Sequence, residues 1–313
     1  MKRALVQLFL CAFLAGCAQF VPQTIALRSV WPPDVARMVE LRHVPFFPQS
    51  EYQCGPASLA TIMNAAGARV DPSDLVDQVY LPARQGSLQV EMLAAPRRHG
   101  LVGWQMPANY DALLREVAAG RPVLVLQDLG IWPFTKWHYA VVVGFDYESG
   151  ELYLRSGETK RRALPFTIFE VTWRRSGYWA MVVTPPGTIP ATATEATYWS
   201  ALLAFERAAN PALSRHAWEA FLARWPGHVL ASVALANRYY SARELPKAES
   251  VLRQAALRSP ESAEVLNNLA QVLSDLGRHD EALAFIDRAA VLKGPFEAEV
   301  AATRADLLRR AGR

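Results

Sequence analysis

The chain has 313 residues, enough for about two domains, because a single domain usually contains roughly 100 to 200 residues. Its 33 lysines and arginines nearly balance its 29 aspartates and glutamates, so the formal net charge is only +4. No run of basic residues is present, which argues against a nucleic-acid-binding protein.

The first 17 residues have the pattern of a bacterial export signal. Lys2 and Arg3 precede an apolar run over residues 4–14, which is too short to span a membrane as a mature helix. The following Leu14-Ala15-Gly16-Cys17 resembles the lipobox of bacterial lipoproteins, in which the cysteine is acylated and becomes the mature N-terminus. Ala18 comes next rather than Asp, and this resemblance implies sorting to the periplasmic face of the outer membrane. An ordinary cleaved signal peptide is the alternative.

The cysteines of the mature chain follow from this prediction. Cleavage removes Cys11, and lipidation occupies Cys17, so Cys54 becomes the only free thiol and no disulfide can form within one chain. An unpaired cysteine in an exported protein suggests a functional thiol.

Residues 18–41 have few periodic apolar positions and contain Trp31-Pro32-Pro33. We interpret them as a tether that lifts the next domain, residues 42–184, off the membrane.

Cys54 lies at the predicted start of a helix. The segment before it contains two prolines, and residues 57–63 have the dense apolar pattern of a buried helix. Pro56 fits the first helical turn, whose N–H groups have no helical partner to lose, and Gly55 permits close approach of another chain segment. The free N–H groups and the helix dipole at this end favour a thiolate.

Further along this domain the patterns predict helices first and mainly antiparallel strands later, an α+β order. The expected helices cover residues 71–76, 88–98 with Ser87 as a cap, 110–119 and 165–173, and the expected strands cover residues 101–106, 122–126, 137–146, 152–156 and 178–183. His138 lies at the entry of strand 137–146, which a turn at 148–150 connects to the next strand.

Residues 185–195 are rich in proline and threonine and predict a linker, and residues 196–313 form an almost entirely helical domain with a sequence period of 34. Matching apolar residues recur at this period: Leu235 with Leu269, Ala236 with Ala270, Tyr239 with Leu273, Ala248 with Ala282, Leu252 with Ile286, and Ala255 with Ala289. The pattern resembles the tetratricopeptide repeat (TPR), an all-α solenoid that binds proteins. Two units (229–262 and 263–296) would follow a degenerate helix pair and precede a capping helix at 297–310.

Cysteine proteolysis needs a thiolate, an imidazole, a group that orients the imidazole and donors for the oxyanion. Cys54 at a helix start and His138 on a later strand follow the order of papain-like enzymes. Together with Gln49, the segments 54–60 and 138–146 resemble the bacteriocin-processing, C39-like peptidase family. Over residues 44–183 this resemblance implies a papain-like α+β domain with Cys54 as nucleophile and His138 as general base and acid. Gln49 would then donate to the oxyanion with the backbone N–H of Cys54, and Gln53 is a lesser candidate.

The third catalytic position departs from the family pattern. Family members usually place an Asp, followed by Pro, on the strand after the His strand, and Ser156 stands at that position here. A serine can accept the imidazole N–H but cannot stabilise the imidazolium by charge. Glu158 could supply a carboxylate instead, and Asp146 is a weaker choice because it ends a strand in a structural motif.

Two further groups of residues have weaker interpretations. Trp132, Phe134 and Trp137 could form a substrate-side wall or pack in the core. The other histidines show no spacing typical of metal ligands, so we expect neither a metal nor a cofactor: His43, His99, His216, His228 and His279.

The sequence as a whole predicts a lipid-anchored cysteine peptidase of the cell envelope that acts on peptides or proteins and binds a protein partner through its repeats. The alternative is a peptidase-like scaffold that has lost turnover and captures peptides. A Cys-His pair also supports transfer of other amide or thioester groups. Bacteriocin processors cut after paired glycines but are usually fused to an export ATPase, and no phosphate-binding glycine-rich loop occurs here.

Overall fold

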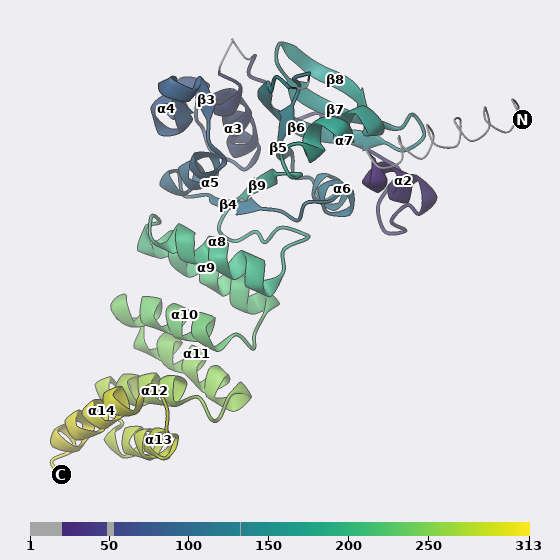
Figure 1. The fold of residues 1–313 in the computed structure, drawn as a ribbon. Helices are drawn as coiled ribbons and strands as arrows, with labels where there is room; N and C mark the ends of the chain where they lie inside the picture. Colours follow the sequence, from purple (N-terminus) through teal and green to yellow (C-terminus); the bar gives the residue numbers. More distant parts are fainter. Residues whose placement is uncertain (1–20, 49–52, 132) are drawn as a thin grey trace, which may run out of the picture. The chain divides into compact units, whose positions relative to one another are not determined.

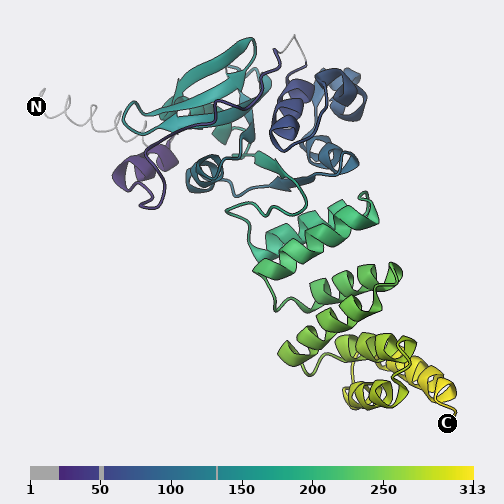
Figure 2. The same ribbon diagram turned by 180° about the vertical axis from the view of Figure 1, so that it is seen from behind.

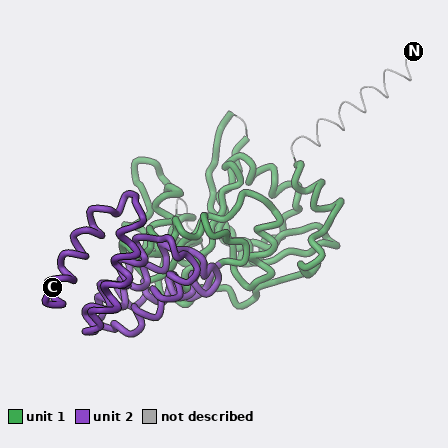
Figure 3. Tube along the Cα trace, turned by 90° about the horizontal axis from the view of Figure 1, so that it is seen from below, with its two compact units in different colours: residues 1–185, 190–208 green, residues 186–189, 209–313 purple. Residues whose placement is uncertain are grey.

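The computed structural model describes residues 21–48, 53–131 and 133–313, and the chain divides into two compact units (Figure 1 and Figure 3). The first unit contains the chain up to residue 185 together with residues 190–208, and the second contains residues 186–189 and 209–313. A sheet-containing unit therefore precedes a helical one, which confirms the predicted α+β and all-α fold classes.

Seven strands of the described residues form one antiparallel sheet in the first unit, in the order β4-β9-β5-β6-β7-β8, with β1 paired to the far end of β6. A separate hairpin is formed by β2 and β3. The strands are β1 (Met38–Glu40), β2 (Tyr80–Leu81), β3 (Gly86–Ser87), β4 (Val102–Gln105), β5 (Val123–Asp128), β6 (Trp137–Asp146), β7 (Glu151–Ser156), β8 (Thr159–Pro165) and β9 (Ala180–Thr184).

Helices cover this sheet, and α3 packs against β5, β6 and β9 in its centre (Figure 1 and Figure 2). The residues of β5 are all buried, as expected for a central strand with a continuous apolar run. The helices of this unit are α2 (Pro22–Ser29), α3 (Cys54–Ala65), α4 (Pro72–Val79), α5 (Gln89–Arg98), α6 (Tyr110–Ala118), α7 (Phe166–Arg174) and α8 (Glu195–Glu206), with a short 3₁₀ helix at Pro82–Arg84.

The long strand β6 begins and ends at the predicted residues, and α4 begins directly after Asp71, which forms a capping box with Asp74. The cap predicted for α5 is wrong, because Leu88 occupies the N-cap position and Ser87 belongs to β3. β8 was not predicted, because its residues are almost all exposed and its first four are polar, so it lacks the apolar pattern of a buried strand.

The described part of the segment predicted to be a tether, residues 21–41, instead packs as part of the first unit. Glu170 of α7 is fully buried and accepts hydrogen bonds from the backbone N–H groups of Gln23 (2.9 Å) and Thr24 (2.6 Å) and from the Thr24 hydroxyl (2.6 Å). The carboxylate thus satisfies free donors at the start of α2 and complements its dipole. Further along, Trp31 packs edge-on against Tyr147, and β1 joins the sheet.

A second buried carboxylate holds part of the segment predicted to be a linker. Glu116 of α6 is fully buried and accepts hydrogen bonds from the backbone N–H (2.7 Å) and the hydroxyl (2.7 Å) of Thr192, and it pairs with Arg121. Helix α8 follows this anchor directly and groups with the sheet, where Tyr198 and Leu202 are buried.

The second unit consists of antiparallel helix pairs. Successive helices contact one another, and the residues that align at the 34-residue period are all buried, which confirms the repeat pattern. The helices are α9 (Pro211–Arg224), α10 (Val229–Ser241), α11 (Leu245–Arg258), α12 (Ala263–Asp275), α13 (His279–Val291) and α14 (Glu297–Arg310). Within the described residues, none of the helices combines the length and apolar character needed to cross a bilayer.

Candidate active site

Cys54 is the first residue of α3, and its side chain is half-buried. The following nine residues, 55–63, are all buried, because this helix lies in the centre of the unit. Pro56 occupies the first turn, as predicted, where it displaces no helical hydrogen bond. The helix therefore presents its N-terminal end, with the thiol, at the edge of a well-packed core.

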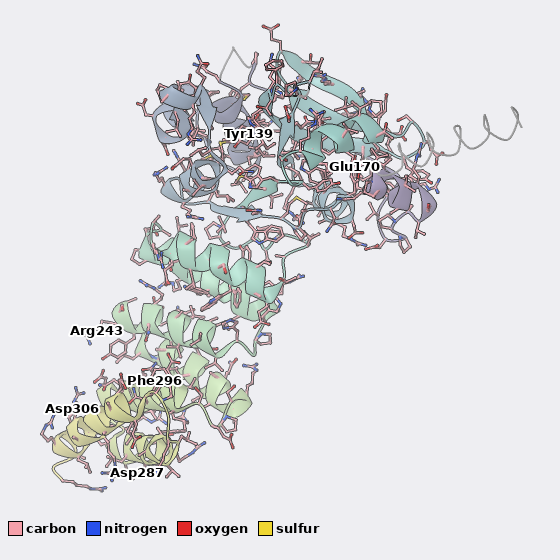
Figure 4. All side chains as sticks on the ribbon, in the orientation of Figure 1. Tyr139, Glu170, Arg243, Asp287, Phe296 and Asp306 are labelled. Carbon is pink, nitrogen blue, oxygen red and sulfur yellow. The ribbon has the colours of Figure 1, made fainter. Side chains whose placement is uncertain are left out.

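The start of α3 is attached to β6 at Tyr139, which is labelled in Figure 4 and directly follows His138 in the sequence. The backbone of Tyr139 hydrogen-bonds the Cys54 sulfur, and one helical turn later the Ser58 hydroxyl donates to the Tyr139 carbonyl at 3.1 Å. Residues four apart lie on the same side of a helix, so Cys54 and Ser58 can both hydrogen-bond the backbone of Tyr139. The thiol therefore lies against the backbone of the residue that follows His138.

His138 contacts the predicted third residue. Its Nε2 atom lies 2.9 Å from Oγ of Ser156, which ends β7 and is 4% exposed. Val141 of β6 pairs with Arg155 of β7, so the two neighbouring strands bring His138 and Ser156 together. Since Nε2 is engaged with Ser156, Nδ1 is the ring nitrogen left for a thiol or a substrate.

Burial controls the charge of both groups. It raises the pKa of the Cys54 thiol above its usual value, although hydrogen bonds from the backbone of Tyr139, Gly55 and Cys54 oppose this effect. Burial also lowers the pKa of His138 to about 4, and the positive charges of Arg162 and Lys136 add to this. At neutral pH the pair is therefore a thiol and a neutral imidazole. The predicted preference for a thiolate is wrong, because desolvation outweighs the helix N-terminus.

Residues 41–181 match the model of the Peptidase_C39 like family, and residues 233–298 match the tetratricopeptide repeat. The chain carries a C39-like peptidase domain followed by TPRs. The predicted resemblance is thereby confirmed at the level of both domains.

Solved structures that are similar to parts of this chain include two peptidases and a TPR protein. A C39-like peptidase from Bacillus anthracis is 17% identical, with 47% of this chain and 96% of that one covered and a TM-score of 0.40. A double-glycine-motif protease of an AMS/PCAT transporter, in complex with the leader peptide, is 19% identical. The match covers 48% of this chain and 96% of that one, with a TM-score of 0.37. A thermophilic TPR protein from Thermus thermophilus is 23% identical. The match covers 38% of this chain and 76% of that one, with a TM-score of 0.31. The comparison with curated proteins gave no match.

Other predicted site residues of the C39-like domain have different environments. Gln49 lies outside the described residues, whereas Gln53 is exposed and directly precedes α3. Glu158 is exposed in the turn between β7 and β8, and the His138 ring makes its hydrogen bond, within the described residues, to Ser156 instead. Asp146 ends β6 and accepts the N–H of residue 148 at 2.8 Å, which supports a structural role.

Phe134, before β6, is 78% exposed, and Trp137, the first residue of β6, is 50% exposed, so neither packs in the core. Trp132, like Cys17, lies outside the described residues. Within the described parts of the chain, no three His, Cys, Asp or Glu side chains are arranged to hold a metal ion.

The contact of Ser87 with Gly55 in the C39-like domain was not predicted from the sequence. Ser87 of β3 lies over Gly55, and its carbonyl accepts a hydrogen bond from the Tyr139 hydroxyl at 3.1 Å. The predicted close approach at Gly55 is confirmed, but only the fold identifies Ser87 as the partner. The β2–β3 hairpin thus covers Gly55, the residue next to Cys54.

We expect Gly55→Ala to displace the start of α3. The added Cβ would lie 2.2 Å from Ser87 Oγ and 2.7 Å from Ser87 Cβ, so the hairpin or the helix must move. Such overpacking costs about 1–3 kcal/mol, measurable by urea unfolding, and should slow alkylation of Cys54. Gly86→Ala in the same hairpin is the control, because its nearest atom is 3.7 Å away. The double variant Gly55→Ala/Ser87→Gly should regain stability; a fully stable and reactive Gly55→Ala protein contradicts this contact.

Proposed function

We propose that the C39-like domain is a cysteine peptidase in which Cys54 is the nucleophile and His138 is the general base and acid. The observation that carries the proposal is the 2.9 Å contact between His138 Nε2 and Ser156 Oγ, beside a thiol at the start of α3. A nucleophile, a base and a group that orients the base are thus present in one place.

The reaction begins from the neutral pair. As Cys54 Sγ attacks the scissile carbonyl carbon, the thiol proton passes to His138 Nδ1 and the carbonyl electrons move to oxygen. The C–N bond then breaks, the leaving amine takes the proton from Nδ1, and a thioester remains on Cys54. Water attacks the thioester with His138 as base, the acid product leaves, and the thiol regains its proton.

Ser156 orients the imidazole in this scheme. Its oxygen accepts the Nε2–H, which keeps the proton on that nitrogen and leaves Nδ1 free to act as base. We assign stabilisation of the oxyanion to the backbone N–H of Cys54 and, following the family pattern, to Gln49.

A peptide-binding scaffold without turnover is the second candidate. It is favoured by the serine at the position of the family's Asp and by the His138 pKa of about 4, since both make the imidazolium costly. In such a scaffold the thiol of Cys54 would be unreactive.

Incubation of the purified full chain with a defined peptide pool, followed by mass spectrometry, tests the proposal. New peptide termini that form at a rate proportional to protein concentration support the peptidase. Intact peptides together with an unreactive Cys54 overturn it in favour of the scaffold.

We also propose that the protein is anchored in the bacterial envelope through a lipid on Cys17 and that the TPRs bind a protein partner there. The support for the anchor is the sequence of residues 1–17. We expect Cys17→Ala to abolish incorporation of radiolabelled palmitate and to release the protein from the membrane fraction. Cys11→Ala is the matched control and should change neither; unchanged labelling of Cys17→Ala refutes the anchor.

A further inference from the structure

Two positively charged side chains flank His138. Lys136 precedes it by two residues, and the hydrogen bond from Leu129 N to the Lys136 carbonyl (2.9 Å) continues the β5–β6 ladder through Lys136. Residues two apart in an extended strand share a face of the sheet. Lys136 and His138 therefore project to the same side.

Arg162 reaches the same side from β8. It pairs with Leu154 of β7, which lies two residues before Ser156, the hydrogen-bond partner of His138. Cross-strand partners share a face, and neighbouring strands are about 4.8 Å apart. The strands β6, β7 and β8 lie side by side (Figure 1). Long side chains from β6 and β8 can thus converge beside the imidazole, and both charges act on it.

Within the described residues, these two cations lack the partners that nearby arginines have. Arg161 pairs with Glu40 at 2.8 Å, and Arg175 donates to the carbonyl of Gly130 at 2.6 Å. Lys136 and Arg162 are exposed, and their side chains make no hydrogen bond or ion pair with the described parts of the chain. Glu158, in the adjacent turn, is paired with neither of them.

Positive charge at this position opposes the proposed catalysis in the absence of substrate. His138 must carry a proton after the thiol attacks, and two cations destabilise the imidazolium while Ser156 offers no negative charge. A carboxylate bound between the cations would neutralise them and stabilise the protonated ring. A substrate with such a group would therefore supply a negative charge that the described residues do not place there.

We propose, building on the peptidase function, that Lys136 and Arg162 bind a substrate carboxylate on the leaving-group side of the scissile bond. His138 delivers its proton to the leaving amine, so the groups that flank His138 face the part of the peptide that departs. The carboxylate is either an Asp or Glu side chain or the C-terminal carboxylate of a short peptide.

A peptide pool with matched members tests this inference. Each peptide has Glu or Gln at the positions after a potential cleavage site, and each is made with a free and with an amidated C-terminus. We expect the Glu or the free-terminus form to be cleaved with about tenfold higher kcat/KM at low salt, and the preference to weaken as salt rises. The ratio of kcat/KM for Glu and Gln peptides reports a side-chain carboxylate. The ratio for free and amidated C-termini reports a terminal carboxylate.

Removing the positive charges of Lys136 and Arg162 tests whether these residues cause the preference for a carboxylate. Lys136→Gln/Arg162→Gln should lower the selectivity ratio to within about twofold of unity. Arg161→Gln on the opposite face of β8 is the matched control and should retain the wild-type ratio. Cleavage of wild type without any carboxylate preference, or a ratio unchanged in the double variant, overturns the inference while leaving the peptidase proposal intact.

A binding measurement keeps the inference testable if no peptide is cleaved. The Cys54→Ala variant is immobilised, the same pool is applied, and the retained peptides are identified by mass spectrometry. Enrichment of carboxylate-bearing members that disappears when Lys136 and Arg162 are also replaced supports the inference, even if the peptidase proposal fails. Equal retention of acidic and neutral members overturns it.

Discussion

Replacing Cys54 with alanine should abolish both peptide cleavage and labelling by iodoacetamide. In the proposed mechanism the thiol supplies the electron pair that forms the thioester, and alanine has none to offer, so we expect cleavage to fall by at least about 10³-fold. Cleavage is measured by mass spectrometry of released peptides, and labelling is assigned to the peptide that contains residue 54.

His99→Ala is the control for unspecific effects, because His99 contacts Gln78 and not the site. It should cleave like the wild type, whereas His138→Ala should retain the thiol yet lose turnover. Persistent cleavage by Cys54→Ala means that another residue is the nucleophile or that a contaminating peptidase is responsible.

The substitution Ser156→Asp should make His138 a stronger base. A carboxylate 2.9 Å from Nε2, where the serine oxygen lies now, would stabilise the imidazolium and raise the His138 pKa from about 4 by about one to three pH units. NMR titration of the imidazole ring measures this directly. We expect kcat/KM to rise on the order of tenfold because proton transfer from the thiol costs less free energy.

The same change should alter stability in acid. The pKa of His138 in the wild type lies below its ordinary value of 6.5, so the unfolded chain binds more protons than the folded protein between pH 6.5 and about 4. Stability is therefore lost as the pH falls through this window, and Ser156→Asp should reduce the loss contributed by His138. Ser156→Ala, which keeps the site uncharged, should retain the low pKa; an equally low pKa in Ser156→Asp contradicts the assigned geometry.

The elements that hold the candidate site could be predicted because their signals are local. The apolar run of β6 and the dense apolar pattern after Cys54 each fall within one element, and both are found where expected. The repeat helices are likewise specified by a period in the sequence. The docking of α2 could not be predicted, because it depends on hydrogen bonds to Glu170, which is 146 residues from Thr24.

The chemistry of the site was only partly predictable. The position of Ser156 followed from the family pattern, and the contact with His138 agrees with that position. The attachment of α3 at Tyr139 and the contact of Ser87 with Gly55 join segments far apart in sequence, so no local motif could predict them. The protonation of Cys54 was mispredicted because burial is set by the complete fold, whereas the helix terminus is visible locally.

If Cys17 carries the proposed lipid, the anchored position of α2 limits how far the C39-like domain can stand from the membrane. This helix begins at Pro22, which is held to the domain through the next two residues and Glu170. With an acyl chain on Cys17, as proposed, the five residue steps to Pro22 span at most about 17 Å even when fully extended. The polar layer of a bilayer leaflet already takes up several ångströms of that length. A domain with so short a connection to its lipid anchor would act at the bilayer surface. Its substrates would have to reach it along that surface.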